Sequence, residues 1–152
     1  MAMKDMMTIQ INDNALRKTL RHIERAGTDL TPLMRAIAGT LKTETDFNFE
    51  DEGRPAWQPS LAALDRNGMT LSKTGHLRKS ITVDYSSEHA TIGTNVEYGP
   101  IHQLGGNAGR NQTTELPARP YLPVDESGDL QAGVEQKLLN SALSYLQNAA
   151  QA

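Results

Sequence analysis

Alternating apolar and polar positions between residues 80 and 95 predict a β-hairpin. Ile81, Val83 and Tyr85 alternate with polar residues, and residues 89–95 repeat the alternation after a short polar stretch. A period of two is typical of a strand with one buried face. Two such strands joined by a few small polar residues form a hairpin. We expect this hairpin to be the central element of the fold.

Helical spacing of apolar residues is clearest between Leu30 and Leu41. Apolar side chains recur there every three or four residues, which defines one buried helix face. Pro32 suits the first turn of such a helix. The acidic, glycine-containing segment at residues 50–54 should end it. We therefore predict one long helix in the N-terminal half of the chain.

Weaker patterns complete the predicted element order. They are a strand at residues 7–12, a helix at 13–27, a short helix with Ile101 and Leu104 on one face that ends at Gly105, an edge strand near 121–124, and a C-terminal helix at 128–149. The apolar stripe of this last helix consists of Leu139, Leu143 and Leu146, extended upstream by Val134 and Leu138. This order predicts an α+β fold. Its small antiparallel sheet is built on the central hairpin and packs against the long helix and the C-terminal helix.

Two polar segments, at about residues 50–73 and 105–119, are predicted to be long flexible loops. The first contains Trp57, the only tryptophan, between two prolines, and residues 61–64 could form one helical turn. The second shows no apolar periodicity, and its proline-rich end favours extended backbone. Both loops are longer than ordinary connections, which marks them as candidates for function.

Composition narrows the function classes. The 152 residues predict a single domain spanning residues 1–152, and 38% hydrophobic with 5% aromatic residues predicts a modest aliphatic core. A net charge of −3 gives no general attraction to nucleic acid or to anionic membranes. The absence of cysteine excludes disulfides and thiolate chemistry. No apolar run resembles a signal peptide or a membrane span, so we expect no membrane partner.

Catalytic and metal-binding patterns are weak. The four histidines are never three or four residues apart, so helical metal-ligand spacing is missing. Ser80, Asp84 and His102 could be combined into a hydrolytic triad, but no nucleophile-elbow motif accompanies Ser80. No glycine pattern for phosphate binding occurs. We predict that the protein is not an enzyme and has no metal or cofactor.

A local basic patch leaves DNA binding open. Lys73, His76, Arg78 and Lys79 lie close together in the sequence, without interleaved aromatic residues that could stack on bases. A solvated surface is the simpler interpretation. The role of Trp57 is also undecided from the sequence. Its side chain could fill its own loop, or it could anchor an interface, where tryptophan often dominates the binding energy.

Several short motifs, in their order and spacing, carry a family resemblance. They are Glu52-Gly-Arg-Pro-Ala-Trp-Gln-Pro59, Leu71-Ser-Lys-Thr-Gly-His-Leu-Arg-Lys-Ser-Ile81, Ile92-Gly-Thr-Asn95, Tyr98, Ile101-His-Gln-Leu-Gly-Gly106 and Pro117-Ala-Arg-Pro-Tyr-Leu122. Over about residues 10–150 the chain resembles the phage virion morphogenesis family. That family includes tail completion proteins of tailed phages and Mu-like prophages.

The resemblance implies a non-enzymatic virion component that acts in tail completion or head–tail joining. Such proteins commonly work as rings, and no catalytic residues carry over from the family. The implied partners are copies of the chain itself, tail tube or terminator proteins and head-connector proteins, with non-specific DNA contact as a further partner. The expected location is the host cytoplasm during assembly and then the virion.

If the protein forms a ring, we expect the two loops to make much of the contact between subunits. A closed ring needs heterologous contacts, and polar loops that become ordered on association suit them. The candidate interface residues are Trp57, Arg78, Tyr98, His102, Arg119 and Tyr121. Alternative functions are a DNA-binding, capsid-assembly or packaging-associated protein, and a small hydrolase that uses Ser80 or His102.

Overall fold

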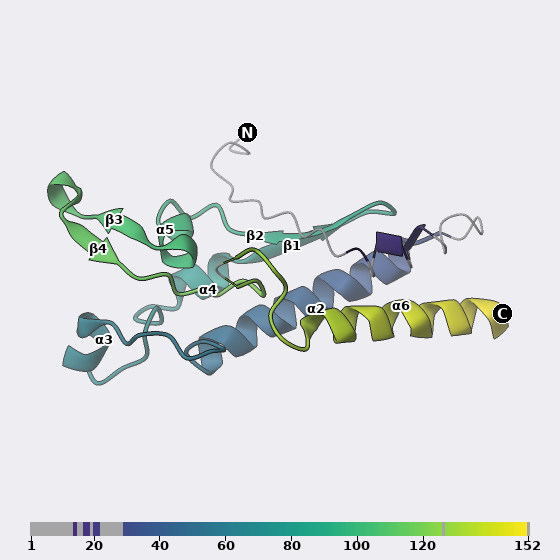
Figure 1. Ribbon diagram of the computed structural model, residues 1–152, viewed down its shortest axis with the longest axis horizontal. Helices are drawn as coiled ribbons and strands as arrows, with labels where there is room; N and C mark the ends of the chain where they lie inside the picture. Colours follow the sequence, from purple (N-terminus) through teal and green to yellow (C-terminus); the bar gives the residue numbers. More distant parts are fainter. Residues whose placement is uncertain (1–13, 15–16, 19, 22–28, 126, 152) are drawn as a thin grey trace.

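The computed structural model describes residues 14, 17–18, 20–21, 29–125 and 127–151 (Figure 1). Its helices are α2 (Thr31–Glu50), α3 (Leu61–Asp65), α4 (His76–Ser80), α5 (Gly99–Leu104) and α6 (Val134–Gln151), with a 3-10 turn η2 (Arg110–Gln112). Its strands are β1 (Thr82–Tyr85), β2 (Ala90–Gly93), β3 (Gly106–Ala108) and β4 (Thr114–Leu116). The predicted α+β fold is confirmed, but β1–β2 and β3–β4 form separate two-stranded antiparallel sheets.

The long helix α2 lies antiparallel to α6 along the length of the molecule (Figure 1). Its buried side chains include Leu33, Ile37 and Leu41, which confirms the predicted helix face. α2 ends at the predicted break, where the Gly53 N–H donates to the Asn48 carbonyl O at 2.8 Å. A Cβ on Gly53 would lie 2.5 Å from the Trp57 side chain, so only glycine fits this turn.

The apolar stripe of α6 agrees with the prediction only in its upstream part. Val134, Leu138 and Ala142 are the buried residues that face α2, spaced four apart. Val134 and Leu138 were predicted and are confirmed, but Leu143 is 49% exposed and Leu139 only partly buried, so the downstream part of the predicted stripe was displaced around the helix by about one position. The C-terminal half of α6 is rich in leucine and alanine on several faces, and only packing against α2 decides which face is inside. The side chain of Leu146 lies outside the described residues.

The central hairpin is confirmed, with Val83 opposite Ile92 and Tyr85 opposite Ala90. Ala90 and Ile92 pack against the core between the helices. Val83 and Tyr85 nevertheless remain 39% and 38% exposed, because among the described residues no third strand extends the sheet beside β1. The sheet face on which Val83 and Tyr85 lie was therefore predicted correctly, whereas the burial of the two side chains was overestimated.

A second apolar cluster lies where α2 ends. Its buried members are Phe49, Trp57, Leu77, Ile81, Tyr121, Leu122 and Val124. The segment 121–124 was predicted to be an edge strand of the sheet, and this was wrong. Val124 makes only an isolated bridge with Leu130, and the backbone of Tyr121 and Leu122 bonds to buried side chains instead of a strand. The segment crosses the core with bends at Leu122 and Pro123, and the Val124 N–H donates to the Leu122 carbonyl O at 2.7 Å.

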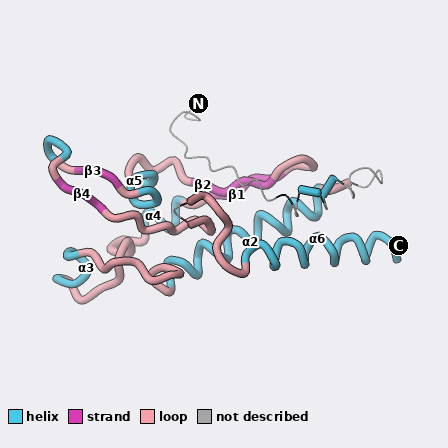
Figure 2. Tube along the Cα trace, viewed as in Figure 1, coloured by secondary structure: helices cyan, strands magenta, loops and turns pink. Residues whose placement is uncertain are grey.

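Both predicted loops are partly ordered. The first, here called the α3 arm (residues 51–73), carries the short helix α3 at the helical turn expected from the sequence. The second, here called the β arm (residues 105–119), was predicted to be a flexible loop and instead contains the hairpin β3–β4. Its strands are exposed on both faces, so no apolar alternation marks them in the sequence. Figure 2 shows both arms extending from the same end of the molecule.

The short helix α5 ends at Gly105, as predicted. Its apolar face was predicted wrongly, because Leu104 is 64% exposed whereas Gln103 is buried. The predicted strand at residues 7–12 lies outside the described residues. Within the predicted helix at 13–27, the described residues are helical. No helix in the described part of the chain is long and apolar enough to cross a bilayer.

Candidate functional site

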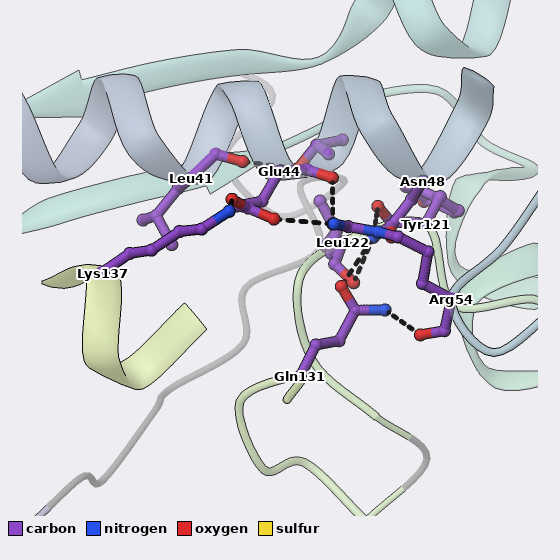
Figure 3. A network of polar contacts seen from close by, with 9 residues as sticks. Leu41, Glu44, Asn48, Arg54, Tyr121, Leu122, Gln131 and Lys137 are labelled. Carbon is purple, nitrogen blue, oxygen red and sulfur yellow. Dashed lines mark hydrogen bonds and ion pairs between the residues drawn. The ribbon is translucent and has the colours of Figure 1, made fainter. Parts of the chain in front are cut away.

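A buried polar network holds the base of both arms against α2 (Figure 3). Glu44, on α2, is 2% exposed and pairs with Arg54, whose Nη2 lies 2.7 Å from Glu44 Oε2. Lys137, near the start of α6, also donates a hydrogen bond to the Glu44 carboxylate. Burial acts to raise the pKa of Glu44, but the hydrogen bonds and charges of Lys137 and Arg54 outweigh it and lower that pKa. The carboxylate therefore stays ionised and joins three segments.

Asn48 extends this network one turn further along α2. Its amide Nδ2 donates to the Tyr121 carbonyl O and to Gln131 Oε1, both at 2.9 Å. Arg54 Nε donates to Asn48 Oδ1 at 2.9 Å, and Gln131 Nε2 donates to the Arg54 carbonyl O at the same distance. These bonds fix the start of the α3 arm relative to the segment that follows the β arm.

Two further bonds tie the arms directly to each other. The Trp57 indole Nε1 donates to the Pro120 carbonyl O at 3.0 Å, and Arg119 Nε donates to the Gln58 carbonyl O at 2.7 Å. Arg119 is 5% exposed, and its burial lowers its pKa from the ordinary value. These two bonds join the bases of the arms directly.

Gln103, on α5, has a structural role that the sequence analysis missed. Its Oε1 accepts hydrogen bonds from the backbone N–H groups of Tyr121 at 3.0 Å and Leu122 at 2.9 Å. Tyr121 in turn donates its hydroxyl to the Gly99 carbonyl O at 2.7 Å, and burial raises its pKa. A Cβ on Gly99 would lie 2.7 Å from Thr94, so glycine permits this close packing. The sequence offered one signal for this role of Gln103, which is a polar residue at a buried position of the helix.

His102 lies beside this bonded core. Its ring meets Tyr98 edge-on at a centroid distance of 5.9 Å, and its buried Nδ1 has no hydrogen-bond partner among the described residues. Burial, and secondarily the charge of Arg119, lower the pKa of His102. The Arg119 N–H donates to the His102 carbonyl O at 2.8 Å, which closes the neck of the β arm.

The basic patch is partly neutralised. Arg78 lies 3.2 Å from Asp46 and 2.8 Å from Glu50, both on α2, and its strongest hydrogen bond, to Glu50, contributes most to its raised pKa. Lys73 and Lys79 have no ion-pair partner among the described residues. The patch therefore retains a smaller free charge than its sequence suggests.

The predicted interface residues divide by burial. Trp57, Arg119 and Tyr121 lie inside the subunit, whereas Tyr98 is 44% exposed and His102 and Arg78 are half-buried. The interface role of these residues stays a prediction. The contacts of the three buried residues show that they hold the arms in place.

Exposed apolar side chains gather elsewhere. On the α3 arm, Leu61 is 79% exposed, Leu64 63% and Met69 41%. Leu104, at the neck of the β arm, is 64% exposed. Sequence reasoning assigned Leu61 and Leu64 only to a helical turn, and nothing in the local pattern showed that α3 would bury Ala63 alone.

The structure offers little support for the hydrolase interpretation. The Ser80 hydroxyl donates to the Leu77 carbonyl O at 2.6 Å, and Asp84 lies 3.7 Å from His89. In the described part of the chain neither residue is hydrogen-bonded to His102. No cluster of three or more metal-ligating side chains occurs among the described residues.

Comparison with known proteins gives a consistent result. The model of the phage virion morphogenesis family matches residues 11–147. Mu-like prophage FluMu G protein 2 of Haemophilus influenzae is 41% identical over 130 residues, covering 83% of this chain and 92% of the relative. The putative capsid assembly protein G of Escherichia phage Mu is 33% identical over 108 residues, covering 62% of this chain and 69% of the relative.

A second Haemophilus influenzae protein, Mu-like prophage FluMu G protein 1, is 30% identical over 132 residues, which cover 79% of this chain and 82% of the relative. No solved structure is significantly similar to the chain. The family match runs from before α2 into α6 and includes both arms and the polar network that fixes them. The chain therefore belongs to the phage virion morphogenesis family.

Proposed function

We propose that the protein is a non-enzymatic structural subunit of virion assembly that acts in tail completion or head–tail joining. It forms a ring with copies of itself and contacts tail tube or terminator proteins on one side and head-connector proteins on the other. Family membership supports a structural role in virion assembly. The finer role is carried by the architecture of the two arms.

The proposal rests on a contrast in burial between the bases of the two arms, which are bonded inside the subunit, and helix α3, whose leucines are exposed. Trp57 and Arg119 lock the bases together inside the subunit, whereas Leu61 and Leu64 extend almost uncovered from α3. Exposed apolar side chains on a rigid base are suited to protein–protein contact, because little conformational entropy is lost on binding. A subunit built in this way offers preformed contacts to its neighbours.

Capsid assembly is the second candidate function. The relative from phage Mu carries the description of a putative capsid assembly protein, and it is 33% identical to this chain. The same arms would then contact capsid proteins. The two candidates differ in which structure fails to form when the protein is missing.

Electron microscopy of a lysate from a phage that lacks this gene distinguishes them. Filled heads beside unjoined or overlong tails would support tail completion and joining. Empty or malformed heads would support capsid assembly instead. Intact infectious particles would contradict both candidates, and complementation with the wild-type gene is the control.

DNA contact is a lesser part of the proposal. Lys73 and Lys79 are the cations of the basic patch without an ion-pair partner among the described residues, and they would face DNA only within the assembly. If the contact exists, DNA affinity should fall steeply with salt and fall further in a Lys73→Gln, Lys79→Gln variant. Absence of binding at moderate salt would remove this partner.

A further inference from the structure

The sheet β1–β2, which lies along α2, has an apolar face that the described residues leave partly uncovered (Figure 1). β1 pairs with β2 on one side, and among the described residues no strand pairs with its other side. Val83 and Tyr85 of β1 are 39% and 38% exposed. Ile92 and Ala90, directly opposite them on β2, pack against the core. Residues directly opposite each other share a sheet face, so the uncovered part of this face lies beside β1.

The free edge of β1 is suited to a further strand. Unpaired N–H and C=O groups along a strand edge form a template for pairing. Proteins that keep such an edge open commonly block it with proline or with inward-pointing charges. β1 contains no proline, and its only charged residue, Asp84, lies on the opposite sheet face from Val83 and Tyr85. The apolar face is therefore open to a third strand, which a two-stranded hairpin needs for independent stability.

Residues 7–12, outside the described residues, have the sequence of such a strand. Met7, Ile9 and Ile11 alternate with polar residues, and the segment contains neither charge nor proline. A strand with this period places its three apolar side chains on one face. Isoleucine beside valine and tyrosine suits neighbouring strands, because aromatic and β-branched side chains there stabilise each other.

The same chain can deliver this segment to β1. The described residues 14, 17–18 and 20–21 are helical, and Leu20 packs against the core between α2 and α6, as Ala90 and Ile92 do. On α2 this core runs from Leu30 to Leu41, which is about 16 Å along the helix axis. Six extended residues span about 20 Å, so a strand at 7–12 is long enough to reach β1. A short tether also gives the segment a high effective concentration, which favours it over a strand of another molecule.

We propose that residues 7–12 of the same chain form a third strand on the free edge of β1, with Met7, Ile9 and Ile11 on the face of Val83 and Tyr85. The hairpin then becomes a three-stranded sheet whose apolar face is covered by α2 and by its own neighbours. The inference does not depend on the proposed ring or on the tail or capsid role. It assigns the edge of β1 to the subunit itself, so this edge is not available to neighbouring proteins.

Cysteine pairs test the pairing, because the chain has no cysteine of its own. Val83→Cys is combined in turn with Met7→Cys, Ile9→Cys and Ile11→Cys in the full-length protein, under a mild oxidant. The control is Val83→Cys with Gln10→Cys, whose side chains would lie on opposite sheet faces. At least one test pair should form a disulfide roughly tenfold faster than the control, because the bridge needs Cβ atoms about 3.5–4.5 Å apart.

Non-reducing electrophoresis and mass spectrometry separate the outcomes, and circular dichroism confirms that each variant is folded. A cross-linked monomer that has lost two hydrogen atoms would support the proposal, and the fastest pair would give the register. A cross-linked dimer at low protein concentration would show that the segment pairs with a second copy, and would overturn the assignment to the same chain. Rates no faster than the control in all three pairs would overturn the strand itself.

A matched pair of charged variants gives a second test without cysteine. Ile9→Asp places a carboxylate on the face toward α2, whereas Gln10→Asp places the same group on the solvent side. Ile9→Asp should lower Tm by roughly 4 °C or more, because an unpaired charge is buried. Gln10→Asp should leave Tm nearly unchanged, as surface substitutions usually do. Equal Tm values for the two variants would overturn the proposal.

Discussion

Gln103 is the position where one side-chain atom satisfies two buried backbone donors. Its Oε1 accepts from Tyr121 N–H at 3.0 Å and from Leu122 N–H at 2.9 Å, and the residue is 2% exposed. Replacing Gln103 with methionine keeps an unbranched side chain of similar length and removes this acceptor. Both N–H groups would then be left without a partner in a segment that crosses the core.

The expected loss of stability follows from those two donors. A buried donor left unsatisfied costs about 1–3 kcal/mol, so the Gln103→Met variant should lose about 2–6 kcal/mol in free energy of unfolding. A domain of this size has a total stability of about 5–15 kcal/mol. The loss is therefore a large fraction of the total, and at its upper end the variant would be partly unfolded at room temperature.

Urea denaturation monitored by the fluorescence of Trp57 measures this loss, since Trp57 is the only tryptophan and is buried in the same cluster. The matched control is Gln136→Met, at an exposed position of α6 whose amide, among the described residues, bonds to Asn140 on the surface. Its stability should change by less than about 0.5 kcal/mol. A change below about 1 kcal/mol for Gln103→Met, with an unchanged denaturant slope, would refute the reasoning.

Three further results are expected. The lowered pKa of Glu44 contributes stability that is present above its unfolded value of 4.5 and is lost as pH falls through the folded pKa, so Glu44→Gln should show a shallower acid transition in pH-dependent urea melts. The lowered pKa of His102 means that the unfolded chain binds its proton first; stability should fall as pH drops below 6.5, and His102→Gln should reduce this fall between pH 7 and pH 5. An unchanged pH profile in either variant would contradict the assigned environment. Trp57→Phe removes the bond to the Pro120 carbonyl and should cost about 1–3 kcal/mol in stability, while self-association of the folded protein, measured by sedimentation, stays as in wild type. A large association defect without loss of stability would instead place Trp57 at the interface.

Hydrophobic periodicity predicted the elements that bury a continuous face. The helix from Leu30 to Leu41 and the hairpin β1–β2 were visible because each repeats its apolar positions several times at one period. The stop at Gly105 was visible because the backbone there needs a positive φ, which is 74° in the structure. These features depend on neighbours within a few residues.

The β arm and the face of α5 were missed for the opposite reason. β3 and β4 are exposed on both sides, so their sequence carries no alternation that could separate them from a loop. On α5, the apolar Leu104 points to solvent and the polar Gln103 is buried. Hydrophobic periodicity assumes that apolar residues are buried and polar residues exposed. An apolar residue at a free surface and a polar residue with buried partners both depart from that assumption.

The sequence by itself determined the long helix, the central hairpin and the family, since each rests on local spacing and on the order of short motifs. Tertiary structure alone decided which polar side chains lie inside and whether Trp57 and Tyr121 belong to the core. The partners that settle those questions are distant in the chain, as when Asn48 bonds to a carbonyl 73 residues away. A buried polar group is stable only with such a partner, and no local pattern reports whether folding will bring one.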